Sequence, residues 1–350
     1  MTVASTSDRL REIQAARRDR PFLVKVSDWV RDRPEGGITV MFLLALVLCT
    51  VGGLLYPDSF RFLSQANIEV TLKSVAPLGI MALGVGVLMI AGEYDLSVGS
   101  IYTFATIVAA SLISTHFAGL GASGPFLATF CALVIGVAIG LTNAFITLRF
   151  NIPSFIATLG TMLFWQGAVL LYNGATPLSF VTPEPFNSMF AGQLGYLHAG
   201  LIWFAILSVL FYFILHQHKL GNHFYAVGGN RTAAIAIGVI PTKVKYIAFA
   251  LAGFTAAFAG IIAAARVNSV QPSGGQGFEL QAIAACVIGG CALSGGRGSI
   301  LGIVFGTMLI FLIKDVLLLL QAPGFYFNMF VGALIVMSVV LNTAVRRARA

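Results

Sequence analysis

The feature that most constrains this chain is a succession of apolar stretches, each of about 18 residues or more, separated by short polar segments. Each stretch is long enough to cross about 30 Å of hydrocarbon as an α-helix. Of the 350 residues, 58% are hydrophobic and 10% are charged, whereas a soluble chain usually carries about 25% charged residues. The stretches are continuous and do not alternate in polarity, which favours helices over barrel strands. The sequence therefore predicts an all-α protein, a polytopic bundle of transmembrane helices.

We expect about ten membrane-spanning segments, an even number that places both chain termini on one side. They divide the chain into a basic N-terminal tail (residues 1–37), a membrane domain (38–344) and a short basic C-terminal tail (345–350). The segments are predicted at residues 38–56, 67–91, 98–117, 125–147, 154–172, 200–217, 246–265, 279–293, 299–320 and 326–344.

The distribution of Lys and Arg predicts the orientation of these segments. Loop 173–198 carries neither residue type, whereas both tails and the 218–245 segment are basic. Basic loops stay in the cytoplasm, so we place both termini and 218–245 there and loop 173–198 outside. Arg61, Lys73 and Arg266 do not fit this distribution. The same bias explains the net charge of +8 without nucleic-acid binding, and we expect the N-terminal tail to contact anionic membrane lipid.

The residue types that hold metals or cofactors are not gathered in the sequence. The four cysteines lie within apolar segments and have no histidine at a metal-ligand spacing, which is typical of packing residues: Cys49, Cys131, Cys286 and Cys291. The chain also lacks the G-x-x-x-x-G-K-[ST] phosphate loop. We therefore expect no metal, no cofactor and no enzymatic activity of its own.

Two apolar segments end in similar glycine-rich runs. Residues 77–91 lead into GEYDLSVGS, and residues 279–293 contain the start of GGCALSGGRGS. Short, glycine-interrupted segments in the two halves of a chain are typical of a transport pathway built from broken helices. Ionisable residues at membrane depth are costly and often functional, so Glu93, Asp95, Ser97 and Glu279 are candidate pathway residues. The alternative is structural: Asp95 would cap a helix beginning at Leu96, and Glu279 would be a first-turn acid.

The longest polar interruption runs from His218 to Lys245 and is basic at both ends. Within it, Gly228 and Gly229 are expected to permit a turn, Asn230 to cap a helix, and Thr232 to begin that short helix. Such a segment in a membrane protein is either a long loop or a surface on which another protein docks.

Four motifs resemble those of sugar-type ABC importer permeases, which serve ribose, xylose and related monosaccharides. GEYDLSVGS (92–100) resembles the GG-x-DLSVGS signature, and NIPSFIATLGTM (151–162) resembles a segment of the form P-x-FI-x-TLGTM. AVGGNRTAAIAIGVIPTKVK (226–245) and SVQPSGGQGFELQAIAACVIGGCALSGGRGSILG (269–302) resemble two further family segments. The motifs occur in the family's order and cover most of residues 77–310. Glu93 and Ala292 depart from the pattern, where the family has Gly and frequently Ser.

This resemblance implies a permease subunit of a bacterial inner-membrane importer for a monosaccharide or polyol. It implies a second copy of the chain as a homodimer partner, a cytoplasmic ATP-binding subunit and an extracytoplasmic solute-binding protein. It also makes 226–240 a coupling helix for the ATPase, through Gly228, Gly229, Asn230, Ala233, Ala234 and Gly238, and adds Asn151 to the pathway candidates. The alternatives are a permease for nucleosides, branched-chain amino acids or another small polar solute, and a proton-coupled transporter that uses Glu93, Asp95 or Glu279.

Overall fold

The structure is a computed structural model that describes residues 33 and 35–349. Most of the predicted N-terminal tail therefore lies outside the described residues. Of the predicted C-terminal tail, the described part continues the last helix.

Helices occur at all ten positions predicted from the apolar stretches. Seven of the helices within the described part are long and apolar enough to cross a membrane. They are α3 (Gly36–Leu55), α4 (Gln65–Ile90), α6 (Gly124–Arg149), α7 (Ser154–Asn173), α9 (Ala199–Tyr212, extended by the π turn Phe213–Gln217), α12 (Pro241–Val267) and α14 (Ile300–Leu319). The other apolar helices are α5 (Val98–Ser114), α13 (Phe278–Ile288) and α15 (Phe325–Arg349), whose apolar part is shorter. The polytopic helical bundle predicted from the sequence is confirmed.

Short elements connect these helices at the two ends of the bundle. Helices α10 (Lys219–Gly229) and α11 (Arg231–Ala236) follow α9, and a 3₁₀ turn (Ala118–Ser123) precedes α6. The segment between α7 and α9 holds α8 (Phe186–Phe190) and the hairpin of β2 (Gln193–Leu194) with β3 (Leu197–His198). Its strand β1 (Leu178–Ser179) pairs antiparallel with β4 (Ser269–Val270).

The core forms around α4 and α12. Every residue of α4 from Val75 to Ile90 is buried, and α12 packs against α4, α5 and α6. Small residues allow this contact, because a β-carbon at Gly253 of α12 would overlap the backbone of Gly136 in α6. Helix α3 lies at the edge, packs mainly on α14, and exposes most of its apolar residues. Apolar side chains on the outside are expected where the solvent is lipid.

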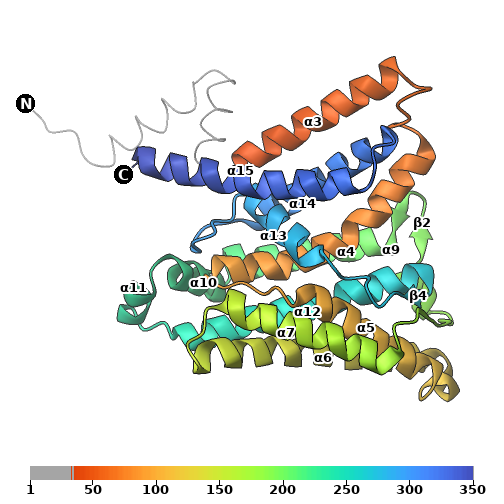
Figure 1. The fold of residues 1–350 in the computed structure, drawn as a ribbon, viewed down its shortest axis with the longest axis horizontal. Coiled ribbons are helices and arrows are strands. Elements are labelled where there is room, and N and C mark those ends of the chain that lie inside the picture. Colours follow the sequence, from red (N-terminus) through yellow and green to blue (C-terminus); the bar gives the residue numbers. More distant parts are fainter. Residues whose placement is uncertain (1–32, 34, 350) are drawn as a thin grey trace, which may run out of the picture.

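The two ends of the bundle carry different segments. In Figure 1, α10, α11 and the C-terminal end of α15 lie at the left, whereas β2 and β4 lie at the right. The 218–245 segment and the C-terminal end of the chain therefore share one end, and segment 173–198 occupies the other. The two segments thus lie at opposite ends, as the Lys and Arg distribution predicts; that the α10–α11 end faces the cytoplasm stays a prediction.

Helix α13 is shorter than the predicted segment 279–293. Its 11 residues span only about 16 Å, roughly half of the hydrocarbon thickness. The helix stops at Ile288 because Gly290 adopts a left-handed conformation (φ 91°), and the chain continues to Ser299 without regular structure. Gly92, which follows α4, has the same left-handed conformation (φ 84°). The two similar motifs thus end their helices in the same way.

Candidate functional site

Three glycine-rich backbone segments meet at the end of the bundle that carries α10 and α11. We call this contact the glycine junction; it comprises Ile90–Gly92, Gly228–Gly229 and Gly295–Gly296. The Gly296 N–H donates a hydrogen bond of 2.8 Å to the carbonyl oxygen of Ile90. A β-carbon at position 228 would overlap that same oxygen and lie 2.7 Å from the nitrogen of Gly296. The turns of both similar motifs therefore contact the end of α10 through main-chain atoms.

The structure corrects the role predicted for Gly228 and Gly229. Neither residue forms a turn, since both belong to the last helical turn of α10 and neither has positive φ. The chain changes direction at Asn230, whose backbone is extended (φ −155°, ψ 102°). Glycine at position 228 is required by close approach, whereas a β-carbon at Gly229 would lie 3.8 Å from the Cα of Gly296, an ordinary van der Waals contact. Periodicity alone does not distinguish a turn glycine from a packing glycine.

Helix α11 projects from the bundle and has the predicted cap, although it starts one residue before the predicted Thr232. The Asn230 side chain accepts a hydrogen bond of 3.0 Å from the Ala233 N–H and so caps the helix, which begins at Arg231. Ala234 is buried against the bundle, and Gly238 turns the chain toward α12 with a φ of 83°. Ile235 of α11, and Ile237 and Ile240 in the connection to α12, expose apolar side chains. Clustered exposed apolar residues of this kind are typical of surfaces that contact another protein or the membrane.

Glu93, in the turn after α4, pairs with Lys245, the last residue of the 218–245 segment. Its carboxylate forms an ion pair with the Lys245 ammonium, in the first half of α12, and both side chains are largely buried. Buried charges are normally paired in this way. The pair joins the turn after α4 to the base of α12, close to the connection made by the glycine junction.

Asp95 lies at the centre of a buried polar network. Its Oδ1 accepts hydrogen bonds from the Ser97 N–H (2.8 Å) and the Ser97 hydroxyl (2.7 Å). Its Oδ2 accepts one from the Asn143 amide (3.0 Å), which also donates to the Ser97 hydroxyl (2.7 Å). All three side chains are completely buried. The carboxylate therefore ties the α4–α5 connection to α6, although the helix that follows begins at Val98 and not at Leu96.

The same connection is also bound to α7. The N–H of Tyr94 donates to the Ser154 hydroxyl, and the N–H of Leu96 donates to the Thr158 hydroxyl, both at 3.0 Å. Ser154 and Thr158 both belong to the 151–162 motif, and through them this motif holds the backbone of residues 94–96. Sequence reasoning missed Asn143, Ser154, Thr158 and Lys245 as members of this site. A polar amide inside an apolar span was the available signal for Asn143.

The remaining pathway candidates lie apart from this network. Glu279 is buried in the first turn of α13, where its Oε1 accepts a hydrogen bond of 3.1 Å from the Gly277 N–H. Asn151 is exposed between α6 and α7 in a left-handed conformation (φ 53°). None of the hydrogen bonds found in the described part links either residue to Glu93 or Asp95.

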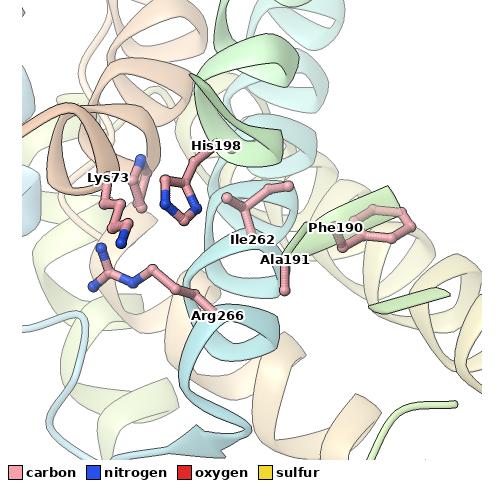
Figure 2. Close-up of a pocket in the computed structure, with 8 residues that line it drawn as sticks. Lys73, Phe190, Ala191, His198, Ile262 and Arg266 are labelled. Carbon is pink, nitrogen blue, oxygen red and sulfur yellow. The ribbon is translucent and has the colours of Figure 1, made fainter. Parts of the chain in front are cut away.

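A small basic cavity lies at the opposite end of the bundle. Lys73 of α4, His198 and Arg266 of α12 point toward it (Figure 2), and its volume of about 10 Å³ holds about one water molecule. Lys73 forms an ion pair of 3.4 Å with Glu69. Burial lowers the pKa of the His198 imidazole, and the Lys73 ammonium lowers it further, while the Glu69 carboxylate opposes the shift. Lys73 and Arg266, two of the basic residues that do not fit the predicted Lys and Arg distribution, thus line the same cavity. Glu69 balances the charge of Lys73.

Within the described residues, no group of three His, Cys, Asp or Glu side chains could hold a metal ion. The main feature of this end of the bundle is the glycine junction, which connects the projecting α10–α11 segment to the turns after α4 and α13.

Comparisons with known proteins show the family to which this chain belongs. Residues 67–339 match the family model described as the permease component of branched-chain amino acid transport systems. The chain is 34% identical to the ribose import permease of Escherichia coli K12 over 303 residues, which covers 85% of this chain and 90% of that protein. It is 33% identical to the ribose import permease of Bacillus subtilis, covering 86% and 91% of the two chains.

A third relative transports a different pentose. The L-arabinose ABC transporter permease of Azospirillum brasilense is 35% identical over 319 residues, which covers 90% of this chain and 89% of the relative. No solved structure matches the chain. The resemblance read from the sequence motifs is confirmed, and the chain belongs to this family of transport permeases as a multi-pass membrane protein.

Proposed function

We propose that this protein is the membrane-spanning permease subunit of a bacterial inner-membrane ABC importer for a monosaccharide. The relatives that carry pentose names support the substrate class, because their similarity extends over most of the chain. The observation that carries the mechanism is the glycine junction, which joins the projecting α10–α11 segment to both broken-helix turns. In this proposal the working unit is a homodimer with a cytoplasmic ATPase and an extracytoplasmic binding protein.

The ATPase docks on α11 in this proposal. The exposed apolar side chains of Ile235, Ile237 and Ile240 would fill a groove on the partner, while the small side chain of Ala233 allows close approach to α11 and Gly238 forms the turn that follows it. Since the sequence lacks a phosphate loop, ATP binds and is hydrolysed in the partner. Movement of α11 passes to α10 and then, through main-chain contacts at Gly228, to the turns after α4 and α13. A contact between backbones transmits displacement with little loss, because no flexible side chain lies between them.

Glu279 is the pathway residue that this proposal retains. It stands at the buried start of a helix that spans half of the membrane, a position at which transporters bind polar solutes. No cation of the described residues forms an ion pair with its carboxylate. A carboxylate in such a place can accept hydrogen bonds from sugar hydroxyls.

Reconstituted transport tests the proposed function. The chain is placed in liposomes with a candidate ATPase and a candidate binding protein, and uptake of labelled ribose, arabinose and xylose is measured. We expect uptake of at least one of these sugars only when ATP, the ATPase and the binding protein are all present. Uptake by the chain alone under a proton gradient would instead support a secondary transporter and contradict the proposal.

The orientation of the bundle gives a separate prediction. Cysteines at Thr232 in α11 and Gln193 in β2, both exposed positions, should differ in their reaction with a membrane-impermeant thiol reagent in intact cells. We expect labelling at position 193 only, because the basic end of the bundle stays in the cytoplasm. The unsubstituted protein controls for reaction of its own cysteines, and permeabilised cells should label both positions. Labelling of 232 in intact cells would show that the orientation is reversed.

A further inference from the structure

A large apolar cavity lies beside the bundle, away from the glycine junction. Helices α3, α4, α9 and α14 enclose a volume of about 330 Å³, which is within the range of small-molecule sites, about 300–1,000 Å³. Its wall is formed mostly by aliphatic and aromatic side chains, including Phe42, Leu72, Leu201 and Met308. Because α3 lies at the edge of the bundle and exposes most of its apolar residues, this cavity lies at the outer, lipid-facing side of the bundle.

One wall of this cavity carries a carboxylate. Asp315 of α14 is only 6% exposed, and each of its oxygens accepts one hydrogen bond from α4. The Asn67 amide donates to Oδ2 at 2.9 Å, and the Thr71 hydroxyl donates to Oδ1 at 2.8 Å. Both donors are neutral and both also line the cavity. Each carboxylate oxygen retains capacity to accept a further hydrogen bond.

The carboxylate lacks a cation. No Lys, Arg or His nitrogen among the described residues forms an ion pair with Asp315. The neighbouring Lys314 is turned elsewhere, with its ammonium 5.5 Å from the ring centre of Phe311 and 5.4 Å from that of Phe327. A buried carboxylate in a membrane protein is normally paired, so the cavity offers a positive ligand its missing partner.

The depth of Asp315 indicates the kind of ligand. It lies four residues before the end of α14 at Leu319, about 6 Å along the helix axis, and Asn67 lies in the first turn of α4. The carboxylate is therefore near the level of lipid headgroups, and the apolar part of the cavity extends toward the middle of the bilayer. An acyl chain gains little by leaving one apolar environment for another, so selectivity must come from the headgroup.

We propose that this cavity binds a membrane phospholipid with a primary ammonium headgroup, such as phosphatidylethanolamine. The ammonium donates hydrogen bonds to the free lone pairs of Asp315, and one acyl chain fills the apolar volume beneath it. Hydrogen bonds between two charged groups are shorter and stronger than neutral ones, and three N–H donors fit a carboxylate that already accepts two bonds. A choline headgroup has the same charge but no N–H donor.

Lipid binding to the full-length chain in detergent tests this proposal. Phosphatidylethanolamine and phosphatidylcholine with identical acyl chains are titrated separately, and bound lipid is counted by native mass spectrometry beside the thermal unfolding midpoint. We expect about tenfold tighter binding of one phosphatidylethanolamine molecule, and a higher midpoint, because only this headgroup donates to the carboxylate. Phosphoethanolamine without acyl chains should have no effect.

Three variants complete the design. Asp315→Asn retains one oxygen, which can accept the hydrogen bond from either Asn67 or Thr71, but it lacks the charge and should bind both lipids equally. Leu72→Trp fills the apolar volume and should bind neither at this site, even if Asp315→Asn fails to fold. Asp58→Asn removes an exposed carboxylate at the same end of the bundle and should retain the preference. Equal binding of the two lipids by the unsubstituted protein, or an unchanged preference in Asp315→Asn or Leu72→Trp, would overturn the proposal.

Discussion

Gly228→Ala is expected to abolish ATP-driven uptake, whereas Gly229→Ala is expected to leave it nearly unchanged. The added methyl group at position 228 overlaps the Ile90 carbonyl oxygen, which accepts the hydrogen bond from Gly296. Since main-chain atoms cannot rotate away as a side chain can, α10 must shift and the junction must open. Overpacking of this kind costs about 1–3 kcal/mol or more. Uptake in reconstituted liposomes and the thermal unfolding midpoint measure the two consequences.

The neighbouring glycine is a matched control for this substitution. Both residues lie in the last turn of α10, so alanine removes the same backbone freedom and improves helix propensity equally at each. A β-carbon at 229 has no described neighbour closer than 3.8 Å. Equal uptake by the two variants would show that contact at the junction does not transmit movement. A Gly228→Ala protein that reaches the membrane, binds the ATPase and fails only in transport would support the coupling mechanism.

Asp95→Ala is expected to destabilise the bundle itself, by about 2–4 kcal/mol, because it strands buried donors on Ser97 and Asn143. Both groups are completely buried, so water cannot replace the carboxylate without entering the core. We expect a lower thermal midpoint and less protein in the membrane. The measurement is the unfolding midpoint in detergent, together with the amount of chain in the membrane fraction.

A comparison with Glu93→Gln separates this structural role from a role in transport. Glutamine at 93 retains an oxygen that accepts a hydrogen bond from Lys245, and both side chains keep some contact with solvent, so its midpoint should fall less than that of Asp95→Ala. Asp95→Asn retains an oxygen acceptor and should lie between the wild type and Asp95→Ala. An Asp95→Ala protein with a normal midpoint but no uptake would contradict the structural role and return Asp95 to the transport pathway.

The sequence is sufficient for the class of fold because hydrocarbon thickness and backbone hydrogen bonding leave few alternatives. It is insufficient for α13, because length statistics do not show that the left-handed Gly290 stops the helix at Ile288. The cap formed by Asn230 is local and was predicted, since it depends on residues three positions apart. The packing role of Gly228 could not be predicted in this way, because its neighbours Ile90 and Gly296 are distant along the chain.

The polar network shows the same limit. Asp95 and Ser97 stand out in the motif, but their partner Asn143 occurs in an apolar helix without any sequence motif around it. Similarly, Glu93 marks a departure from the family pattern, and only the packing of α12 shows that Lys245 balances it. Pairings between residues from different helices depend on how the bundle packs, and one sequence does not contain that information.

The glycine junction also restricts how this protein can evolve. In an ordinary core, an enlarged side chain is accommodated when a neighbour becomes smaller. At Gly228 the neighbours are a carbonyl oxygen and a peptide nitrogen, which no substitution can shrink. Second-site suppressors of a change at 228 must therefore displace an entire helix, and several substitutions would have to arise together. The lipid-facing and solute-facing surfaces can vary one residue at a time, while this point of contact cannot.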